Sequence, residues 1–217
     1  MFVEKENNKI IVAGIGTDVG KTVISAILTE AFGCTYWKPV QAGDLHYSDS
    51  MKIREYCSPE ITILPEKYRL NTPASPHLAA GIDGVEIQLE DIKIPETEPK
   101  LLIEGAGGLM VPLNNKGDLY IDWIRQTKLP VVLVSGNYLG SINHTILSLE
   151  VLKSSGIEVS TIIFNGDAVP SSEEAILQRF PVKKVIRIPR ADDNDLPRFV
   201  KMQARILTES GIDIFSR

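Results

Sequence analysis

Short runs of apolar residues recur along the chain and alternate with stretches of helical spacing. The apolar runs are continuous rather than alternating with polar residues, which is typical of strands buried on both faces of a sheet. Runs of this kind lie at residues 9–13, 101–104, 131–134, 161–164 and 184–188. Helical spacing is found at residues 22–32, 121–127, 143–155 and 172–180.

This alternation predicts an α/β fold, with a mostly parallel sheet covered by helices on both faces. Folds of this class bind ligands at the carboxyl ends of their strands. The notable glycine-rich or polar loops each follow a predicted strand, so we expect one functional edge; they lie at residues 14–20, 105–108, 135–141 and 165–170. Residues 57–99 are rich in proline and acidic side chains and have weak periodicity. We predict an excursion there, with only a short helix near residues 76–81.

Length and composition favour one folded domain over residues 1–217. Hydrophobic residues make up 43% of the chain and charged residues 24%, as in ordinary folded proteins. The net charge of −5 makes nucleic acid an unlikely partner. No apolar run approaches the length of a signal core or a bilayer span, so we expect no membrane association and a cytoplasmic location. Cys34 and Cys57 form no CxxC pair, which favours two ordinary thiols over a metal or redox site.

The strongest single motif begins directly after the first predicted strand. Residues 14–22 read Gly-Ile-Gly-Thr-Asp-Val-Gly-Lys-Thr, and a helical pattern follows at once. Such a loop binds phosphate because its backbone N–H groups turn toward the anion and the helix dipole adds positive potential. Lys21 would then neutralise the outer phosphates and the Thr22 hydroxyl would coordinate magnesium. The spacing has five residues between Gly14 and Gly20 instead of the usual four, and a chance Gly-Lys-Thr in a turn is the alternative.

Three further charged residues are candidates for the same edge. Glu104 ends an apolar strand and precedes a dense glycine run, which favours a magnesium ligand over an exposed carboxylate. Asp49 begins a predicted helix, where a metal ligand and an N-terminal cap are both open. Lys38 follows a short segment, Thr35-Tyr36, that is compatible with the end of a strand. Taken alone, Lys38 is more typical of a solvated surface lysine than of an active-site cation, and the context must decide between them.

The loop at residues 135–144 connects a predicted strand to a long helix. Free amides at that helix start would suit a carboxylate, but an ordinary connection in which Ser141 or Asn143 caps the helix fits equally well. His77 stands beside a proline turn, either as a substrate contact or as a structural residue. His46, His77 and His144 show no metal-ligand spacing, and no Ser-His-Asp or Cys-His arrangement is evident.

Taken together and in order, these motifs resemble the dethiobiotin synthetase family. The five-residue gap in the glycine loop is the form that this family uses. Individually the motifs are weak to moderate, but the ordered set is specific and covers nearly the whole chain. It consists of Gly14-x-x-Thr17-Asp18-Val19-Gly20-Lys21-Thr22, Lys38-Pro39-Val40, Ser48-Asp49, Glu104-Gly105-Ala106-Gly107-Gly108, Leu139-Gly140-Ser141-Ile142-Asn143-His144, Asn165 and Ile188-Pro189.

The resemblance implies a single-domain, P-loop NTPase-like fold and an ATP- and Mg²⁺-dependent cyclo-ligase of biotin biosynthesis. Such an enzyme takes 7,8-diaminononanoate, CO₂ or bicarbonate and ATP, and it forms dethiobiotin, ADP and phosphate through a phosphorylated carbamate. Mg²⁺ would be its metal, ATP its co-substrate and a homodimer its assembly. Catalysis of this kind rests on positioning and charge stabilisation, because both the carbamate and the transferred phosphoryl group are anionic.

The resemblance also implies residue roles. Lys38 and Lys21 would be catalytic, and Thr22, Asp49 and Glu104 would hold the metal. The diamine substrate would be bound by Thr17, Lys38, Ala42, Leu139, Gly140, Ser141, Ile142 and Asn143, with the last five reaching its carboxylate across the dimer interface. The ATP site would comprise Asp18, Val19, Gly20, Lys21, Thr22, Val23, Asp49, Glu104, Gly105, Ala106, Gly107, Asn165, Gly166, Pro189, Arg190 and Ala191.

One position departs from the family pattern, and three alternatives stay open. Ala42 stands where the family usually has serine or threonine, so a substrate hydrogen bond is missing unless Gln41 compensates. Amide-forming relatives such as cobyrinic acid amide synthases carry a glutaminase domain, for which this chain has no room. ParA- or MinD-like switch ATPases use a second lysine in the loop, which is missing here, and no C-terminal basic amphipathic helix is predicted. An inactive paralogue is disfavoured by the intact Lys21, Lys38, Asp49 and Glu104.

Overall fold

The computed structural model describes residues 8–97, 100–191 and 194–216. Parts of the predicted domain 1–217 and of the predicted excursion 57–99 therefore lie outside the described residues. Within them the chain forms a seven-stranded sheet of order β4-β2-β6-β1-β7-β8-β9, in which every pair of neighbours is parallel. The strands are β1 (Lys9–Gly14), β2 (Thr35–Trp37), β4 (Ile63–Leu64), β6 (Leu101–Gly108), β7 (Val131–Gly136), β8 (Val159–Asn165) and β9 (Lys184–Ile188).

The central strands are buried on both faces, as their continuous apolar runs predict. Ile10 to Val12, Leu101 to Ile103 and Val131 to Val134 are inaccessible to solvent. All five predicted strands are confirmed. One loop prediction is wrong, because residues 105–108 continue strand β6 instead of leaving the sheet. Glycine is depleted in strand interiors in general, so a glycine run after Glu104 does not look like a strand from sequence.

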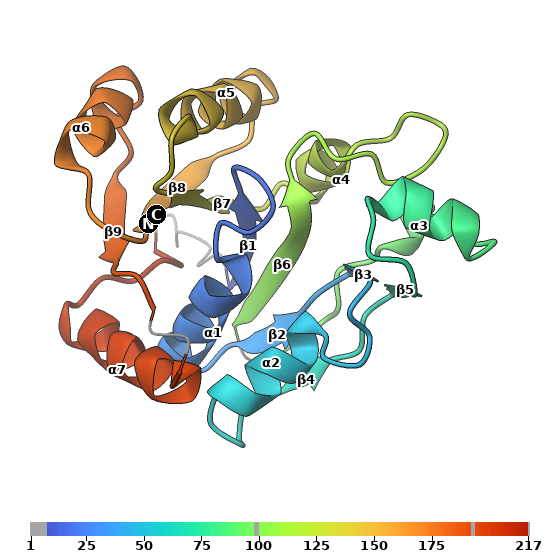
Figure 1. The fold of residues 1–217 in the computed structure, drawn as a ribbon, viewed down its shortest axis with the longest axis horizontal. Coiled ribbons are helices and arrows are strands. Elements are labelled where there is room, and N and C mark those ends of the chain that lie inside the picture. Colours follow the sequence, from blue (N-terminus) through green and yellow to red (C-terminus); the bar gives the residue numbers. More distant parts are fainter. Residues whose placement is uncertain (1–7, 98–99, 192–193, 217) are drawn as a thin grey trace, which may run out of the picture.

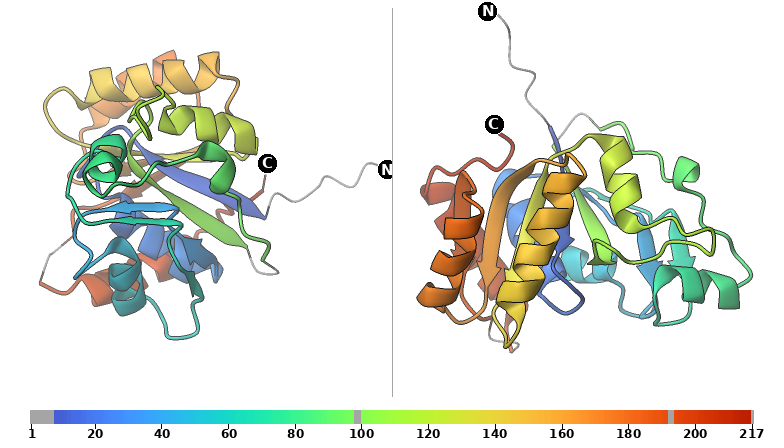
Figure 2. Two further views of the ribbon diagram at one scale, coloured as in Figure 1. Left: turned by 90° about the vertical axis from the view of Figure 1, so that its right-hand side faces the viewer. Right: turned by 90° about the horizontal axis from the view of Figure 1, so that it is seen from above.

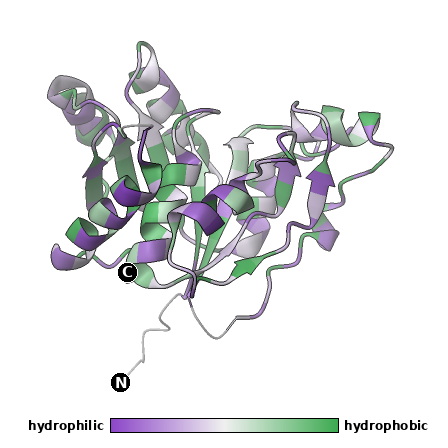
Figure 3. Ribbon diagram, turned by 60° about the horizontal axis from the view of Figure 1, so that its bottom comes forward, coloured by the Kyte–Doolittle hydropathy of each residue, from purple (hydrophilic) through white to green (hydrophobic). Residues whose placement is uncertain are grey.

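Helices cover both faces of the sheet, which confirms the predicted α/β architecture (Figures 1 and 2). In Figure 3 the green, apolar residues gather on the strands and on the inner sides of the helices. The predicted helices are all present, with starts shifted by up to two residues. One face carries α1 (Lys21–Phe32), α2 (Asp49–Tyr56) and α7 (Leu196–Glu209), and the other carries α4 (Tyr120–Thr127), α5 (Ser141–Ser154) and α6 (Pro170–Arg179).

The excursion holds more structure than expected. The predicted short helix is confirmed as α3 (Pro76–Ile82), but β4 also lies in this region, together with β5 (Tyr68–Leu70) and a 3₁₀ turn at Leu89–Asp91. Strand β5 pairs in parallel with β3 (Val40–Ala42) to form a second, two-stranded sheet. Strands of two or three residues are too short to produce a detectable period. Their pairing partners, which lie far away in sequence, decide their structure.

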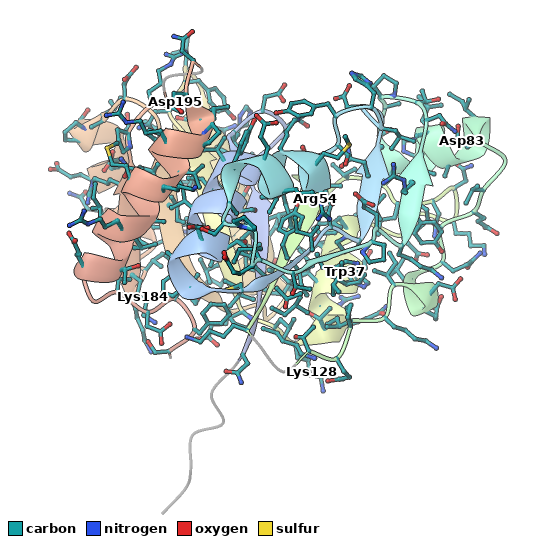
Figure 4. All side chains as sticks on the ribbon, turned by 90° about the horizontal axis from the view of Figure 1, so that it is seen from below. Trp37, Arg54, Asp83, Lys128, Lys184 and Asp195 are labelled. Atoms are coloured by element: carbon teal, nitrogen blue, oxygen red, sulfur yellow. The ribbon has the colours of Figure 1, made fainter. Side chains whose placement is uncertain are left out.

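The C-terminal helix α7 is absent from the sequence prediction, and the expectation that no basic amphipathic helix occurs there is wrong. Asp195, labelled in Figure 4, caps α7 by accepting a hydrogen bond from the backbone N–H of Arg198 at 3.1 Å. The helix carries Arg198, Lys201 and Arg205 on its exposed side. Its apolar side packs against α1. In the part of the chain that the structure describes, no helix is long and apolar enough to cross a membrane.

The packing of α7 against α1 leads to a stability prediction. Leu207 of α7 is 4% exposed, whereas Met202 on the same helix is 50% exposed. Leu207→Ala is expected to lower the free energy of unfolding by about 2–5 kcal/mol, because it leaves a cavity beside α1. Met202→Ala should change it by less than about 0.5 kcal/mol. Denaturant unfolding of both variants measures the difference, and equal effects would contradict the packed apolar side.

Candidate active site: a phosphate loop facing two carboxylates and a buried lysine

A cleft of about 700 Å³ opens at the carboxyl ends of the central strands. The phosphate loop follows β1, Lys38 follows β2 and Glu104 lies in β6, so the order of the sheet brings these three segments together. These segments therefore meet at one edge of the sheet, as predicted, and the functional role of that edge stays a prediction. The residues that line the cleft include Thr17, Asp18, Gly20, Lys21, Thr22, Val23, Lys38, Ala42, Asp49, Glu104, Ala106 and Gly107.

The phosphate loop is held in shape by glycine and by a contact from a distant strand. Gly20 has φ +87°, a conformation that glycine adopts without strain. The Nδ2 of Asn165, at the end of β8, donates to the carbonyl of Val19 at 3.0 Å. A Cβ atom on Gly20 would lie 2.2 Å from that Nδ2. Position 20 thus requires glycine for two reasons, its backbone conformation and the proximity of Asn165.

The glycines of β6 pack directly against the phosphate loop. A Cβ on Gly108 would lie 3.5 Å from the Cα of Gly16, and one on Gly107 would lie 3.8 Å from the Thr17 hydroxyl. Gly107 also has φ +64°. Both distances are ordinary van der Waals contacts, so the phosphate loop itself leaves room for a Cβ atom. The tighter neighbours are side chains, since a Cβ on Gly105 would lie 2.7 Å from Tyr120 and one on Gly107 would lie 2.9 Å from Val111.

Lys21 begins helix α1 and points back into the loop. Its ammonium donates to the carbonyl of Gly16 at 2.7 Å, and the residue is only 8% exposed. Burial lowers the pKa of Lys21 to about 8; Glu104 opposes the shift and Lys38 adds to it. The Lys21 ammonium therefore loses its proton more readily than an ordinary lysine does. An anionic ligand bound at this position would raise the pKa of Lys21 again.

Lys38 is a buried cation between two carboxylates, so the surface-lysine alternative is wrong. It is 5% exposed, and its ammonium donates to Asp49 and, at 3.2 Å, to Oε1 of Glu104. Burial alone would lower the pKa of Lys38, but Glu104 and Asp49 outweigh it and hold the pKa above its ordinary value. Lys38 thus stays charged at neutral pH.

Asp49 does not cap helix α2, so the N-terminal-cap alternative for this residue is wrong. The cap is Ser48, whose hydroxyl accepts from the backbone N–H of Met51 at 3.4 Å. Asp49 is the first helical residue, and its carboxylate pairs with Lys38 and, at 3.3 Å, with Lys52. Its side chain is therefore directed to the cleft and not to the helix backbone.

Glu104 is 1% exposed and receives a donor on each oxygen. Thr22 donates to Oε1 at 2.9 Å and Tyr36 donates to Oε2 at 2.9 Å. Burial and the charge of Glu104 raise the pKa of Tyr36 well above its usual range, so the phenol keeps its proton. Three hydrogen bonds, including that from Lys38, thus compensate one buried negative charge.

The residues predicted to hold magnesium lie together. Thr22, Asp49 and Glu104 supply one hydroxyl and two carboxylates, which are the oxygen ligands that Mg²⁺ prefers. The Lys38 ammonium lies between the two carboxylates, so the site already suits positive charge. Among the described residues no group of three His, Cys, Asp or Glu side chains is placed for a metal, so any metal here relies on Thr22 and on oxygens of a ligand.

Several predicted residues lie away from this cleft. Gly166 and Pro189–Ala191 lie side by side at the ends of β8 and β9, where the N–H of Gly166 donates to Ile188 and Arg190 faces Asp167 at 3.6 Å. Asn165 at the end of β8 does contact the phosphate loop, through its hydrogen bond to Val19. Residues 139–143 also do not line the cleft of their own chain. The capping alternative for this loop is wrong, since Gly140 precedes α5 without any side-chain cap.

Sequence analysis missed some residues in the cleft and one behind it. Tyr36 lies behind the cleft in an apolar strand, where a tyrosine carries no signal of function. Lys52 follows Asp49 by three residues, a helical spacing that predicts an ion pair. For Gln41 the sequence suggests only a substitute for the missing hydroxyl at Ala42. Its amide instead donates to the carbonyl of Gly43 at 3.0 Å and accepts from the N–H of Asp49 at 3.3 Å, which fixes the start of α2.

Comparisons with known proteins agree with this geometry. The profile of a family described as an AAA domain matches residues 8–198. A curated ATP-dependent dethiobiotin synthetase of Christiangramia forsetii is 55% identical over 178 residues, which cover 82% of this chain and 85% of the relative. The chain belongs to the dethiobiotin synthetase family. A second synthetase of this name, from Rhodopseudomonas palustris, is 49% identical over 86% of this chain and 90% of its own length.

One solved structure shares the overall fold of this chain. The ParA family ATPase of Chlorobium tepidum has a TM-score of 0.54, with 16% identity over 97% of this chain and 95% of its own. Identity this low shows the fold alone. The sequence relatives therefore favour a dethiobiotin synthetase over the switch-ATPase alternative, although the two share an architecture.

The lowered pKa of Lys21 leads to a pH prediction. Triphosphate binding should hold Lys21 charged, so above pH 8 each binding event takes up a proton. The affinity for ATP is then expected to fall with rising pH, approaching about tenfold per pH unit. Calorimetric titration at several pH values measures this slope. Lys21→Arg should remove it, because arginine stays charged. A wild-type affinity that is constant above pH 8 would contradict the shifted lysine.

Proposed function

We propose that this protein catalyses the ATP-dependent closure of a cyclic urea, converting 7,8-diaminononanoate and CO₂ to dethiobiotin in biotin biosynthesis. The observation that carries the proposal is the charged, buried Lys38, which faces the same cleft as the phosphate loop. ATP binding alone would require only the phosphate loop. The lysine that two carboxylates fix beside this loop supplies additional positive charge, which an anionic carbamate requires. The cytoplasmic location expected from the sequence stays a prediction.

The proposed reaction has three steps that share one electrophilic carbon, whose attached oxygens carry negative charge. One amine of the substrate attacks CO₂ and loses a proton, which gives a carbamate. A carbamate oxygen attacks the γ-phosphorus of ATP, and ADP leaves. The second amine then attacks the carbonyl carbon and loses a proton, phosphate leaves, and the ring closes. All intermediates are negatively charged at the reacting centre, so stabilisation by fixed cations is the main contribution expected of the protein.

The chain's own residues divide these tasks. Lys21 and the loop N–H groups would hold the triphosphate, and Lys38 would neutralise the carbamate oxygens. Magnesium, held by Thr22, Asp49 and Glu104, would neutralise the phosphate oxygens of ATP. Thr17 lines the cleft beside Gly107 and is the proposed contact for the diamine. Ala42 also lines this cleft, and its methyl group offers the substrate an apolar contact but no hydrogen bond.

We further assign the adenine site to the paired ends of β8 and β9. The proposal is supported by Asn165, which joins the phosphate loop, and by Gly166, which is bonded to Ile188. Pro189–Ala191 follow directly, so the edge continues from the phosphates toward the ends of these strands. Asp18 and Val23 line the cleft where the triphosphate would enter it.

A homodimer is the proposed assembly. A second cavity of about 410 Å³ has mostly apolar walls and includes Met110 and Leu147, both of which are exposed. Thr17 and Val111 line this cavity and the active-site cleft alike, so the two adjoin. Leu139 is fully exposed. In a twofold dimer the same patch contacts itself, which would bring residues 139–143 of one subunit toward the cleft of the other.

The first experiment follows phosphate release and dethiobiotin mass with ATP, Mg²⁺ and bicarbonate, with and without 7,8-diaminononanoate. Release that depends on the diamine and matches dethiobiotin is expected. Lys38→Ala should lower the rate about 100- to 1,000-fold, because it removes charge stabilisation, and should leave ATP binding largely intact. Lys52→Ala removes the other ion pair of Asp49 and serves as the matched control. Comparable loss of ATP binding and of product in Lys38→Ala would refute its proposed role.

The proposed dimer is tested by placing a charge in the apolar patch around the second cavity, which includes Met110 and Leu147. Leu147→Asp should raise the dissociation constant of the dimer by about 100-fold or more, because the carboxylate would be buried without a partner. Ile206→Asp is the control, since Ile206 on α7 is 53% exposed, like Leu147 at 55%, and lies outside the patch. Analytical ultracentrifugation gives the mass. A fully active wild-type monomer would exclude the proposed assembly.

A further inference from the structure

Tyr36 and Glu104 lie side by side because of the register between two strands. Strand β2 pairs in parallel with β6, and Tyr36 lies opposite Leu102. Leu102 and Glu104 are two residues apart and project to the same face, so the side chain of Tyr36 lies on the face of Glu104. The next residue, Trp37 (labelled in Figure 4), projects to the other face, where its indole N–H donates to Pro65 at 3.0 Å.

The two oxygens of Glu104 have different surroundings. Oε1 accepts hydrogen bonds from Thr22 and Lys38, and both of these residues line the cleft. Oε2 accepts from the Tyr36 hydroxyl, and Tyr36 is 0% exposed and does not line the cleft. Only Oε1 is therefore on the side that a metal or a nucleotide can approach.

A carboxylate on its own does not stay in such an orientation. The terminal torsion of glutamate is broad, so the plane of an unrestrained carboxylate rotates at little cost. A donor fixed in the core holds this plane, because any partial rotation would leave the buried Tyr36 hydroxyl without an acceptor. The Tyr36 ring is fixed by its strand and by complete burial.

We propose that Tyr36 is a positioning residue that locks the Glu104 carboxylate, so that Oε1 alone is presented to magnesium. This inference rests on the proposed function only for the identity of the metal and the nucleotide. Tyr36 contacts neither. It acts through Glu104, by keeping one oxygen engaged in the core while the other faces Thr22 and Lys38.

The test is the magnesium dependence of nucleotide binding. Tyr36→Phe keeps the ring and removes only the hydroxyl. A non-hydrolysable ATP analogue should bind wild type and variant equally in EDTA. With Mg²⁺, the variant should need about 10- to 100-fold more metal to reach the same affinity, as expected for a lost partner of a metal ligand. Calorimetry measures both conditions without turnover.

Tyr120→Phe is the matched control. Tyr120 is also buried and packs against the position of Gly105, but its hydroxyl has no hydrogen-bond partner among the described residues. This variant should bind metal and nucleotide as the wild type does. If Tyr36→Phe weakens nucleotide binding as much in EDTA as with Mg²⁺, or if both phenylalanine variants shift the metal requirement equally, the hydroxyl has only a structural role and the proposal fails.

A second measurement isolates the route through Glu104. In a Glu104→Gln background the carboxylate is gone, so adding Tyr36→Phe should cause no further change in metal requirement. Additive effects would overturn the positioning role. Absence of dethiobiotin formation by the wild type would instead refute the proposed reaction, and the binding data would still decide the role of Tyr36.

Discussion

The buried negative charge of Glu104 is the constraint on which the site depends. A carboxylate that is 1% exposed is stable only if it is paired and hydrogen-bonded. Its three partners come from three elements: Thr22 from α1, Tyr36 from β2 and Lys38 from the segment after β2. The sheet order β2-β6-β1 is what places them around one residue. The fold therefore builds the site, since losing either neighbour of β6 would remove part of the compensation of this buried charge.

Two lysines in one cleft differ because their surroundings differ. Lys21 is bonded to a carbonyl, and burial lowers its pKa to about 8, whereas Lys38 lies between two carboxylates that keep its pKa high. Above about pH 8, Lys21 would gain a proton when an anion binds. Lys38 stays charged with or without an anion. This difference matches the proposed division of labour, with Lys21 on the triphosphate and Lys38 on the carbamate. The same carboxylates would draw in a divalent metal beside Lys38.

Much of the fold could be predicted because long parallel strands and helices carry strong periodic signals. Strands β1, β7, β8 and β9 and helix α1 follow their predicted bounds within two residues. The short strands β3, β4 and β5 could not be predicted, because pairing and not local pattern stabilises them. Helix α7 was missed although its apolar side is clear once it packs on α1. The glycines after Glu104 predict a loop from sequence, but the pairing of Gly108 with Gly14 of β1 continues the strand to residue 108.

The sequence alone determined the chemistry of the site: a glycine loop ending in Lys21-Thr22, a strand ending in Glu104, and Lys38 and Asp49 between them. These residues are recognisable because phosphate and metal binding restrict residue type and local spacing. Only the tertiary structure decided that Lys38 is buried between Asp49 and Glu104 and that Tyr36 holds Glu104. The contacts to Glu104 join residues up to 68 positions apart, which no local pattern encodes. Strand order and register, set by packing of the whole core, create them.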